Sequence, residues 1–128
     1  MTDRPDEIIG CVELPPLELE SGRVLEGARQ IYARYGTPRP DGRNIVVVCH
    51  ALTGSHRVTG EKGSGYPQPW WEPIVGHHKA IDTNHLCVYC FNILGSPYGS
   101  TSPLTPNPST GRPWGMDFPI LSVRDIVK

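Results

Sequence analysis

The segment His50-Ala51-Leu52-Thr53-Gly54 has the residue types and the position that could do chemistry in this sequence. It directly follows the apolar run Ile45–Cys49, which is typical of a strand covered on both faces. Loops that leave the carboxyl ends of parallel strands line a common crevice in open α/β sheets. In enzymes that transfer acyl groups on such a sheet, a turn at this place supplies a backbone N–H to the oxyanion hole. The pattern predicts such a turn, and the alternative is an ordinary strand-to-loop turn.

A nucleophile for this chemistry is missing from the sequence. No serine has glycine both two residues before it and two residues after it, so the strained GxSxG turn that exposes a nucleophilic serine is absent. His50 resembles a general base, but we expect it to order the turn through hydrogen bonds. The remaining histidines share no metal-ligand spacing, so no metal site is predicted among them: His56, His77, His78 and His85.

The sequence Cys87-Val88-Tyr89-Cys90 has the CxxC spacing of zinc and redox sites. It lies within Leu86–Ile93, which is expected to be a buried strand. Residues three apart on a strand point to opposite faces, so the two thiols could not easily share one metal or one disulfide. We therefore expect Cys87 and Cys90 to be small buried apolar residues.

Two kinds of strand are expected to position the turn. The run Ile45–Cys49 and the run Leu86–Ile93 are predicted to be neighbouring parallel strands, because the connection between them is long enough for a crossover. The segments Leu17–Leu19 and Ala28–Tyr35 alternate apolar and polar residues and are predicted to form an antiparallel hairpin. Residues 1–16 are acidic, end in Pro15-Pro16, and are expected to form an extended lead-in.

The C-terminal part of the sequence is predicted to be a long ordered loop followed by a helix. Residues Gly95–Pro119 are dense in Gly, Pro, Ser and Thr, and their three aromatic residues favour packing over disorder. Ser122 and Asp125 have the spacing of a capping box at the start of a helix. That helix has only six residues after its cap, which is too short to be stable alone. Residues 17–128 are therefore expected to be an incomplete domain that ends inside an element.

Composition excludes several classes of function. The 128 residues carry a net charge of −1 and no basic run, so nucleic-acid binding and membrane-surface binding have no electrostatic support. No apolar stretch approaches the roughly 20 residues needed to span a bilayer. The N-terminus lacks the apolar segment of a signal peptide, so the expected location is the cytoplasm.

Taken in order, the motifs resemble the N-terminal part of the homoserine O-acetyltransferase family. The similarity extends from about Leu17 to Lys128, and the most specific match is the stretch Asn92–Pro119. The other matching stretches share order and spacing with that family: Leu19–Gly22, Tyr32–Gly36, Asn44–Gly54, Trp70-Trp71 with Ile74–Gly76, and Ala80–Thr83. The segment Gly54–Pro69 is longer and richer in glycine than the common form.

The resemblance implies an α/β-hydrolase fold with a mostly parallel sheet, here truncated, and an antiparallel N-terminal hairpin. It implies transfer of an acetyl group from acetyl-CoA to the γ-hydroxyl of L-homoserine, an early step of methionine synthesis. It also implies a Ser/Asp/His triad that acts through an acyl-serine and lies outside these 128 residues. The backbone N–H of Leu52 would be an oxyanion donor, supported by His50, Ala51, Thr53 and Gly54.

The same resemblance gives expectations for substrates, cofactors and oligomeric state, and it leaves alternative functions open. The complete enzyme is expected to use small-molecule substrates, to bind no cofactor tightly and to be a homodimer. Close relatives use succinyl-CoA or accept L-serine, so both substrates stay open. The chain alone is expected to be inactive. The alternatives are a stand-alone hydrolase with an atypical site, which the missing GxSxG turn disfavours, and a non-catalytic remnant that acts as an interaction module.

Overall fold

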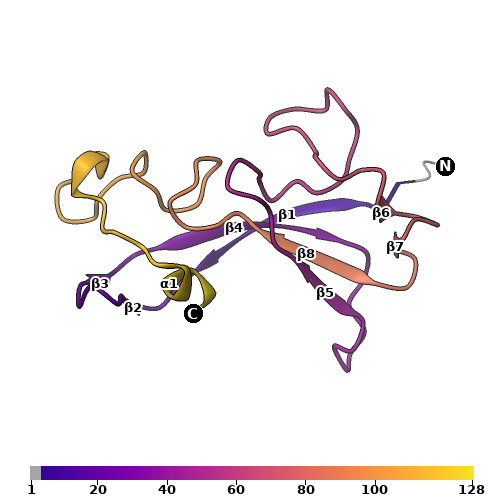
Figure 1. Cartoon of the computed structure of the whole chain (residues 1–128), viewed down its shortest axis with the longest axis horizontal. Coiled ribbons are helices and arrows are strands. Elements are labelled where there is room, and N and C mark those ends of the chain that lie inside the picture. Colours follow the sequence, from indigo (N-terminus) through magenta and orange to yellow (C-terminus); the bar gives the residue numbers. More distant parts are fainter. Residues whose placement is uncertain (1–3) are drawn as a thin grey trace. The chain divides into compact units, whose positions relative to one another are not determined.

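The computed structural model describes residues 4–128, which divide into two compact units. The first unit contains Tyr32–Phe91 together with the N-terminal segment as far as Gly10. The second unit contains Cys11–Ile31 and Asn92–Lys128. Figure 1 follows the chain through both units, and each unit is described by itself.

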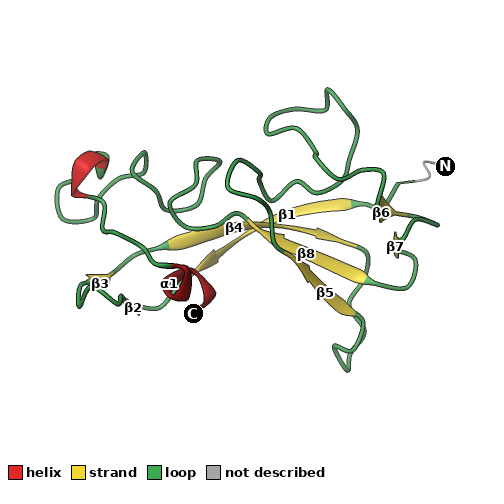
Figure 2. Cartoon of the chain, in the orientation of Figure 1, coloured by secondary structure: helices red, strands yellow, loops and turns green. Residues whose placement is uncertain are grey.

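A four-stranded sheet contains the strands that matter for the candidate site (Figure 2). Its order is β1 (Glu7–Glu13), β4 (Arg29–Tyr35), β8 (Cys87–Phe91) and β5 (Ile45–Val48). Strands β5 and β8 are parallel, which confirms the pairing predicted for the two interior runs. The expectation that Ile45–Cys49 is covered on both faces is wrong, because Ile45 and Val47 point away from the core and are exposed. Strands β4 and β8 are antiparallel, so the sheet is mixed.

An antiparallel hairpin lies near the N-terminus, as expected, but the predicted pairing of Leu17–Leu19 with Ala28–Tyr35 is wrong. Strand β2 (Leu17–Glu18) pairs antiparallel with β3 (Val24–Leu25), and β4 pairs instead with β8. The reason is a turn at Gly22, whose φ of 86° suits glycine, and whose N–H donates to the carbonyl of Leu19 at 2.9 Å. This turn closes a short local hairpin before the chain reaches β4.

The expected lead-in contributes a strand to the sheet. Residues 1–3 lie outside the described residues, but Glu7–Glu13 forms β1 at one end of the strand order, beside β4. Ile8, Ile9 and Val12 are β-branched residues, which favour a strand. The acidic composition of the segment does not indicate this strand.

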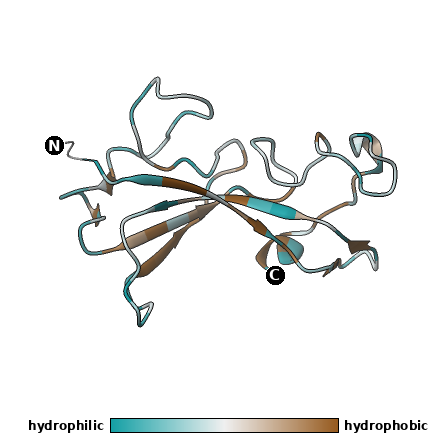
Figure 3. Ribbon diagram, turned by 180° about the vertical axis from the view of Figure 1, so that it is seen from behind, coloured by the Kyte–Doolittle hydropathy of each residue, from teal (hydrophilic) through white to brown (hydrophobic). Residues whose placement is uncertain are grey.

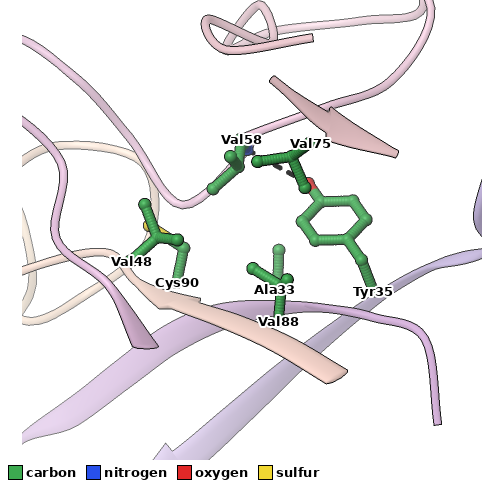
Figure 4. Packing of buried hydrophobic residues seen from close by; sticks show 7 residues of the cluster. All are labelled: Ala33, Tyr35, Val48, Val58, Val75, Val88 and Cys90. Carbon is green, nitrogen blue, oxygen red and sulfur yellow. Dashed lines mark hydrogen bonds between the residues drawn. The ribbon is translucent and has the colours of Figure 1, made fainter. Parts of the chain in front are cut away.

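The core of the first unit lies on one face of the sheet. Alternate residues of β4, β5 and β8 point to this face, as the two-residue period of a strand requires. The strands meet Val58 and Val75 from the connection between β5 and β8. Figure 4 shows the side chains of the cluster together: Ala33, Tyr35, Val48, Val58, Val75, Val88 and Cys90. In Figure 3, which colours the ribbon by hydropathy, β5 and β8 are largely apolar, whereas β1 and β4 mix apolar and polar residues.

The connection between β5 and β8 is mostly loop. It contains β6 (Val75–Gly76) and β7 (Ile81–Asp82), which pair in parallel. The segment Trp70–Val75, which precedes and enters β6, is a turn in which the N–H groups of Ile74 and Val75 both donate to the carbonyl of Trp71. Among residues 4–128, no helix has the length and apolar character to cross a membrane.

The second unit contains Gly95–Pro119, which is an ordered, packed loop as its aromatic residues predict. Its core contains Leu19, Leu25, Ala28 and Leu94, with Trp114 and Leu121 packed against them. Trp114 meets Phe118 edge to face, with ring centroids 5.9 Å apart, beside the 3₁₀ helix η1 (Gly115–Asp117). The hydroxyls of Ser100 and Thr101 accept hydrogen bonds from the backbone N–H groups of Ile31 and Arg29.

The short helix α1 (Val123–Val127) begins with the capping box that the sequence predicts. The Ser122 hydroxyl accepts from the Asp125 N–H, and the Asp125 carboxylate accepts from the Ser122 N–H. The same carboxylate accepts from the Glu20 N–H at 3.0 Å, which joins the helix to the β2–β3 hairpin. A helix too short to be stable alone is therefore fixed by its capping aspartate.

This arrangement predicts a pH dependence of stability. The Ser122 N–H, followed by the Glu20 N–H, holds the pKa of Asp125 below its usual value. A carboxylate whose pKa is lower in the folded state than in the unfolded state stabilises the fold when the pH is above the usual aspartate pKa of about 4. This stabilisation is lost as the pH falls through the pKa of the folded state. We expect Asp125→Asn to lower the melting temperature of the complete protein at pH 7 and to make less difference at pH 3. An equal effect at both pH values would contradict the prediction.

Candidate functional site

The predicted turn leaves the carboxyl end of β5 and is exposed at its tip. The N–H of Gly54 donates to the carbonyl of Ala51 at 2.8 Å, which closes a four-residue turn. Leu52 is the second residue of that turn, and 88% of its surface is exposed. Within residues 4–128 the Leu52 N–H makes no hydrogen bond to the protein. The turn therefore carries a backbone N–H at the end of a parallel strand that no other group of residues 4–128 accepts.

His50 supports this turn from its buried side. Its Nδ1 lies 2.7 Å from the carbonyl oxygen of Ala51. Because a carbonyl oxygen only accepts, Nδ1 carries the proton in this contact. The Ala51 carbonyl thus accepts from both His50 and Gly54. The geometry matches the supporting role expected of His50, and its role in catalysis stays a prediction.

Gly54 fits the turn because it has no side chain. A Cβ at this position would lie 3.0 Å from the Cβ of His50 and 3.2 Å from the carbonyl oxygen of Ala51. Both separations are tighter than ordinary van der Waals contact, so a larger residue would displace the turn. Ala51 and Thr53 are exposed, with Leu52 between them.

The CxxC cysteines are separate buried thiols, as the strand period predicts. The Cys87 thiol lies 3.7 Å from the carbonyl of Gly36, and the Cys90 thiol lies 3.6 Å from the carbonyl of Ser55. Burial, with a smaller effect of Cys49, raises the pKa of Cys90 to about 12, against a lowering by a hydrogen bond from the His50 backbone. Cys90 is therefore a neutral thiol. Among the described residues, no group of three His, Cys, Asp or Glu side chains could hold a metal ion.

The segment after the turn is held by an ion pair that sequence reasoning missed. Arg57, whose side chain is 10% exposed, places Nε 3.1 Å and Nη2 3.1 Å from the carboxylate of Glu7 on β1. Its remaining donors reach the carbonyl of Pro67 and the hydroxyl of Ser64. A bidentate arginine of this kind ties the loop that follows the turn to a strand of the sheet.

Tyr35 completes this network from the core side. Its hydroxyl donates to the Glu7 carboxylate at 2.7 Å and accepts from the Val58 N–H at 3.2 Å. Burial, and then the hydrogen bond to Glu7, raise the pKa of Tyr35 above its usual value, so the hydroxyl keeps its proton. No local signal reveals the network, because Glu7, Tyr35 and Arg57 are far apart along the chain.

No protein-family model matches the chain. A homoserine O-acetyltransferase of Symbiobacterium thermophilum is 48% identical over 88% of this chain. A homoserine O-succinyltransferase of Acidithiobacillus ferrooxidans is 46% identical over the same share. The chain spans 30% of the length of each of these two relatives.

Solved structures agree with the sequence relatives. The crystal structure of homoserine O-acetyltransferase from Bacillus anthracis superposes with a TM-score of 0.81 at 28% identity, over 94% of this chain and 34% of that one. The crystal structure of esterase E22 superposes with a TM-score of 0.82 at 29% identity, over 95% of this chain and 35% of that one. These neighbours have the α/β-hydrolase fold. Over most of its length, the chain is homologous to members of the homoserine O-acetyltransferase family, on an α/β-hydrolase scaffold.

Proposed function

We propose that the complete protein transfers an acetyl group from acetyl-CoA to the γ-hydroxyl of L-homoserine, and that this chain supplies the Leu52 N–H to the oxyanion hole. The observation that carries the proposal is the closed turn after β5, in which Leu52 is exposed and its N–H makes no hydrogen bond within residues 4–128. The identity to a homoserine O-acetyltransferase supports the choice of reaction.

The proposed role of the turn follows from the charge that develops during acyl transfer. Attack of a nucleophile on a thioester carbonyl forms a tetrahedral intermediate whose oxygen is negative. Fixed N–H donors stabilise that oxygen because they need no reorganisation as the charge develops. His50 and Gly54 would keep the Ala51 carbonyl occupied and the Leu52 N–H aimed outward. The nucleophilic serine and its acid–base partners would come from residues outside this sequence, because no GxSxG turn lies within it.

The acyl donor and the acceptor are the finer parts of the proposal. Relatives named for acetyl transfer and for succinyl transfer have similar identity to this chain, 48% and 46%. Acetyl-CoA and L-homoserine are our first choice, and succinyl-CoA and L-serine are the alternatives. The proposal includes a homodimeric, cytoplasmic enzyme without a tightly bound cofactor.

A thiol-release assay on the complete protein tests the proposal. Acetyl-CoA or succinyl-CoA is mixed with L-homoserine, with L-serine or with no acceptor, and free CoA is followed with a thiol reagent. We expect release that depends on L-homoserine and is fastest with acetyl-CoA. Dependence on another pair of substrates would reassign the substrates, and no release with any acceptor would refute acyl transfer. The 128-residue chain, run in parallel, is expected to release no CoA above buffer.

A hydrolase is the second candidate, favoured by the similarity to esterase E22. It predicts CoA release or ester cleavage at the same rate whether or not an amino-acid acceptor is present. The arm without acceptor therefore separates the two functions in one experiment.

A further inference from the structure

We propose that Trp70 and Cys90 are positioning residues, which aim the Leu52 N–H by holding the carbonyl of Ser55. This inference rests on the proposed function, since it concerns the same turn. Ser55 directly follows Gly54, the residue that closes the turn, and Ser55 is almost fully buried. Any movement of Ser55 would therefore be passed to the turn through a single peptide bond.

Two donors from different parts of the chain converge on this one carbonyl. The indole N–H of Trp70 donates to the Ser55 oxygen at 2.9 Å. The thiol of Cys90 lies 3.6 Å from the same oxygen, within range for a sulfur donor. A carbonyl oxygen has two lone pairs, so these contacts use its whole accepting capacity. The Ser55 carbonyl is thus fixed both by the sheet and by the loop.

Cys90 connects the end of the turn to the strand from which the turn starts. In the parallel register, Cys90 is the partner of Val48, the last residue of β5. The backbone of His50, the first residue of the turn segment, lies close enough to this thiol to lower its pKa. One fully buried side chain therefore contacts both the start and the end of the segment from His50 to Ser55.

Trp70 holds the same carbonyl from the connection between β5 and β8. Its ring stacks on Trp71, with centroids 5.5 Å apart and planes 14° from parallel. The backbone N–H of Trp71 donates to the carbonyl of Val58 at 2.7 Å. The Trp70–Trp71 pair thus meets the segment after the turn at two points, Ser55 and Val58. Loss of the indole bond would free one of them.

The expected effect is on the chemical step rather than on substrate binding. The proposed donor acts on an oxygen that becomes negative only as the reaction proceeds, so a misdirected N–H lowers kcat with little change in KM. Small displacements of catalytic groups can cost as much as about 100-fold in rate. For the loss of one of two anchors we expect a fall in kcat of about tenfold, well short of that limit.

Trp70→Phe and Trp71→Phe form a matched pair for the test. Both tryptophans are about equally exposed, at 36% and 37%, and both changes keep an aromatic ring in the stack. Only Trp70→Phe removes the hydrogen bond to Ser55. In the thiol-release assay of the complete protein, we expect Trp70→Phe to lower kcat about tenfold at nearly constant KM, and Trp71→Phe to lower it much less. Equal kcat values for the two variants would overturn the role of Trp70.

The Cys90 pair tests the second anchor and decides the question if Trp70→Phe does not fold. Cys90→Ser keeps a donor near Ser55, whereas Cys90→Ala removes it. We expect the serine variant to retain more kcat than the alanine variant when both melt cooperatively. A higher or equal kcat for the alanine variant would refute the role of Cys90. Failure of the wild-type protein to transfer any acyl group would instead refute the proposed function, so the two failures are distinguishable.

Discussion

Replacing Leu52 with proline is expected to lower the kcat of acyl transfer by the complete protein by about 10²–10³-fold. Proline has no N–H, so the substitution removes the proposed oxyanion donor. The Leu52 side chain is almost fully exposed in this structure, which makes its loss a small contribution beside that of the donor. Steady-state thiol release measures the effect, and KM for acetyl-CoA is expected to change far less than kcat.

Leu52→Ala is the control for this experiment. Alanine keeps the N–H and removes most of the side chain, so it separates donor loss from side-chain loss. Because proline also fixes φ, circular dichroism and a melting curve of the proline variant check that the backbone is otherwise intact. A folded proline variant with wild-type kcat would show the oxyanion assignment to be wrong, and an equally slow alanine variant would shift the effect to the side chain.

Replacing Glu7 with alanine is expected to lower the free energy of unfolding by about 3 kcal/mol. The change leaves the guanidinium of Arg57 nearly buried without its counter-ion, and it removes the acceptor of the Tyr35 hydroxyl. Removing one partner of a buried pair is costly because the other charge stays away from water. Urea unfolding of the complete protein measures the loss.

Asp6→Ala is the matched control, because it removes a neighbouring carboxylate that is exposed. Surface substitutions of this kind usually change stability by about 0.5 kcal/mol or less. Glu7→Gln is expected to be intermediate, since the amide keeps one acceptor oxygen but loses the charge. If Glu7→Ala were no worse than Asp6→Ala, the ion pair with Arg57 would contribute nothing to stability.

The interior of the sheet could be predicted from sequence because its strands carry their own signal. The β-branched run Ile45–Val48 and the apolar run Cys87–Phe91 have few alternatives to a parallel pair of strands, although Ile45 and Val47 are exposed in this chain. Ser122 and Asp125 predicted the helix start because a capping box is a local pattern. The partner of β4 could not be predicted, because alternation indicates a strand without saying which strand it pairs with.

The position of the candidate site could be predicted from the sequence, but the long-range contacts that hold the turn in place could not. The turn after β5 is visible in sequence because small residues directly follow an apolar run. The anchor at Ser55 depends on an indole 15 residues away and a thiol 35 residues away, and both arrive only when the loop and the sheet have formed. The pair of Glu7 and Arg57 likewise joins residues 50 positions apart. Such contacts are properties of the fold, and no local pattern encodes them.

The hydrogen bond between Glu20 and Asp125 has a consequence for the order in which this chain can fold as it is synthesised. The two residues are 105 positions apart, and the whole segment Tyr32–Phe91 of the first unit is translated between them. The β2–β3 hairpin therefore leaves the ribosome early. Its Glu20 N–H cannot bond to the Asp125 carboxylate until nearly all of this sequence has been made. Contacts so distant along the chain form late, because the loop between them must first close at an entropic cost. The first unit, whose segment from Tyr32 to Phe91 is continuous, can close while the second still lacks its C-terminal half.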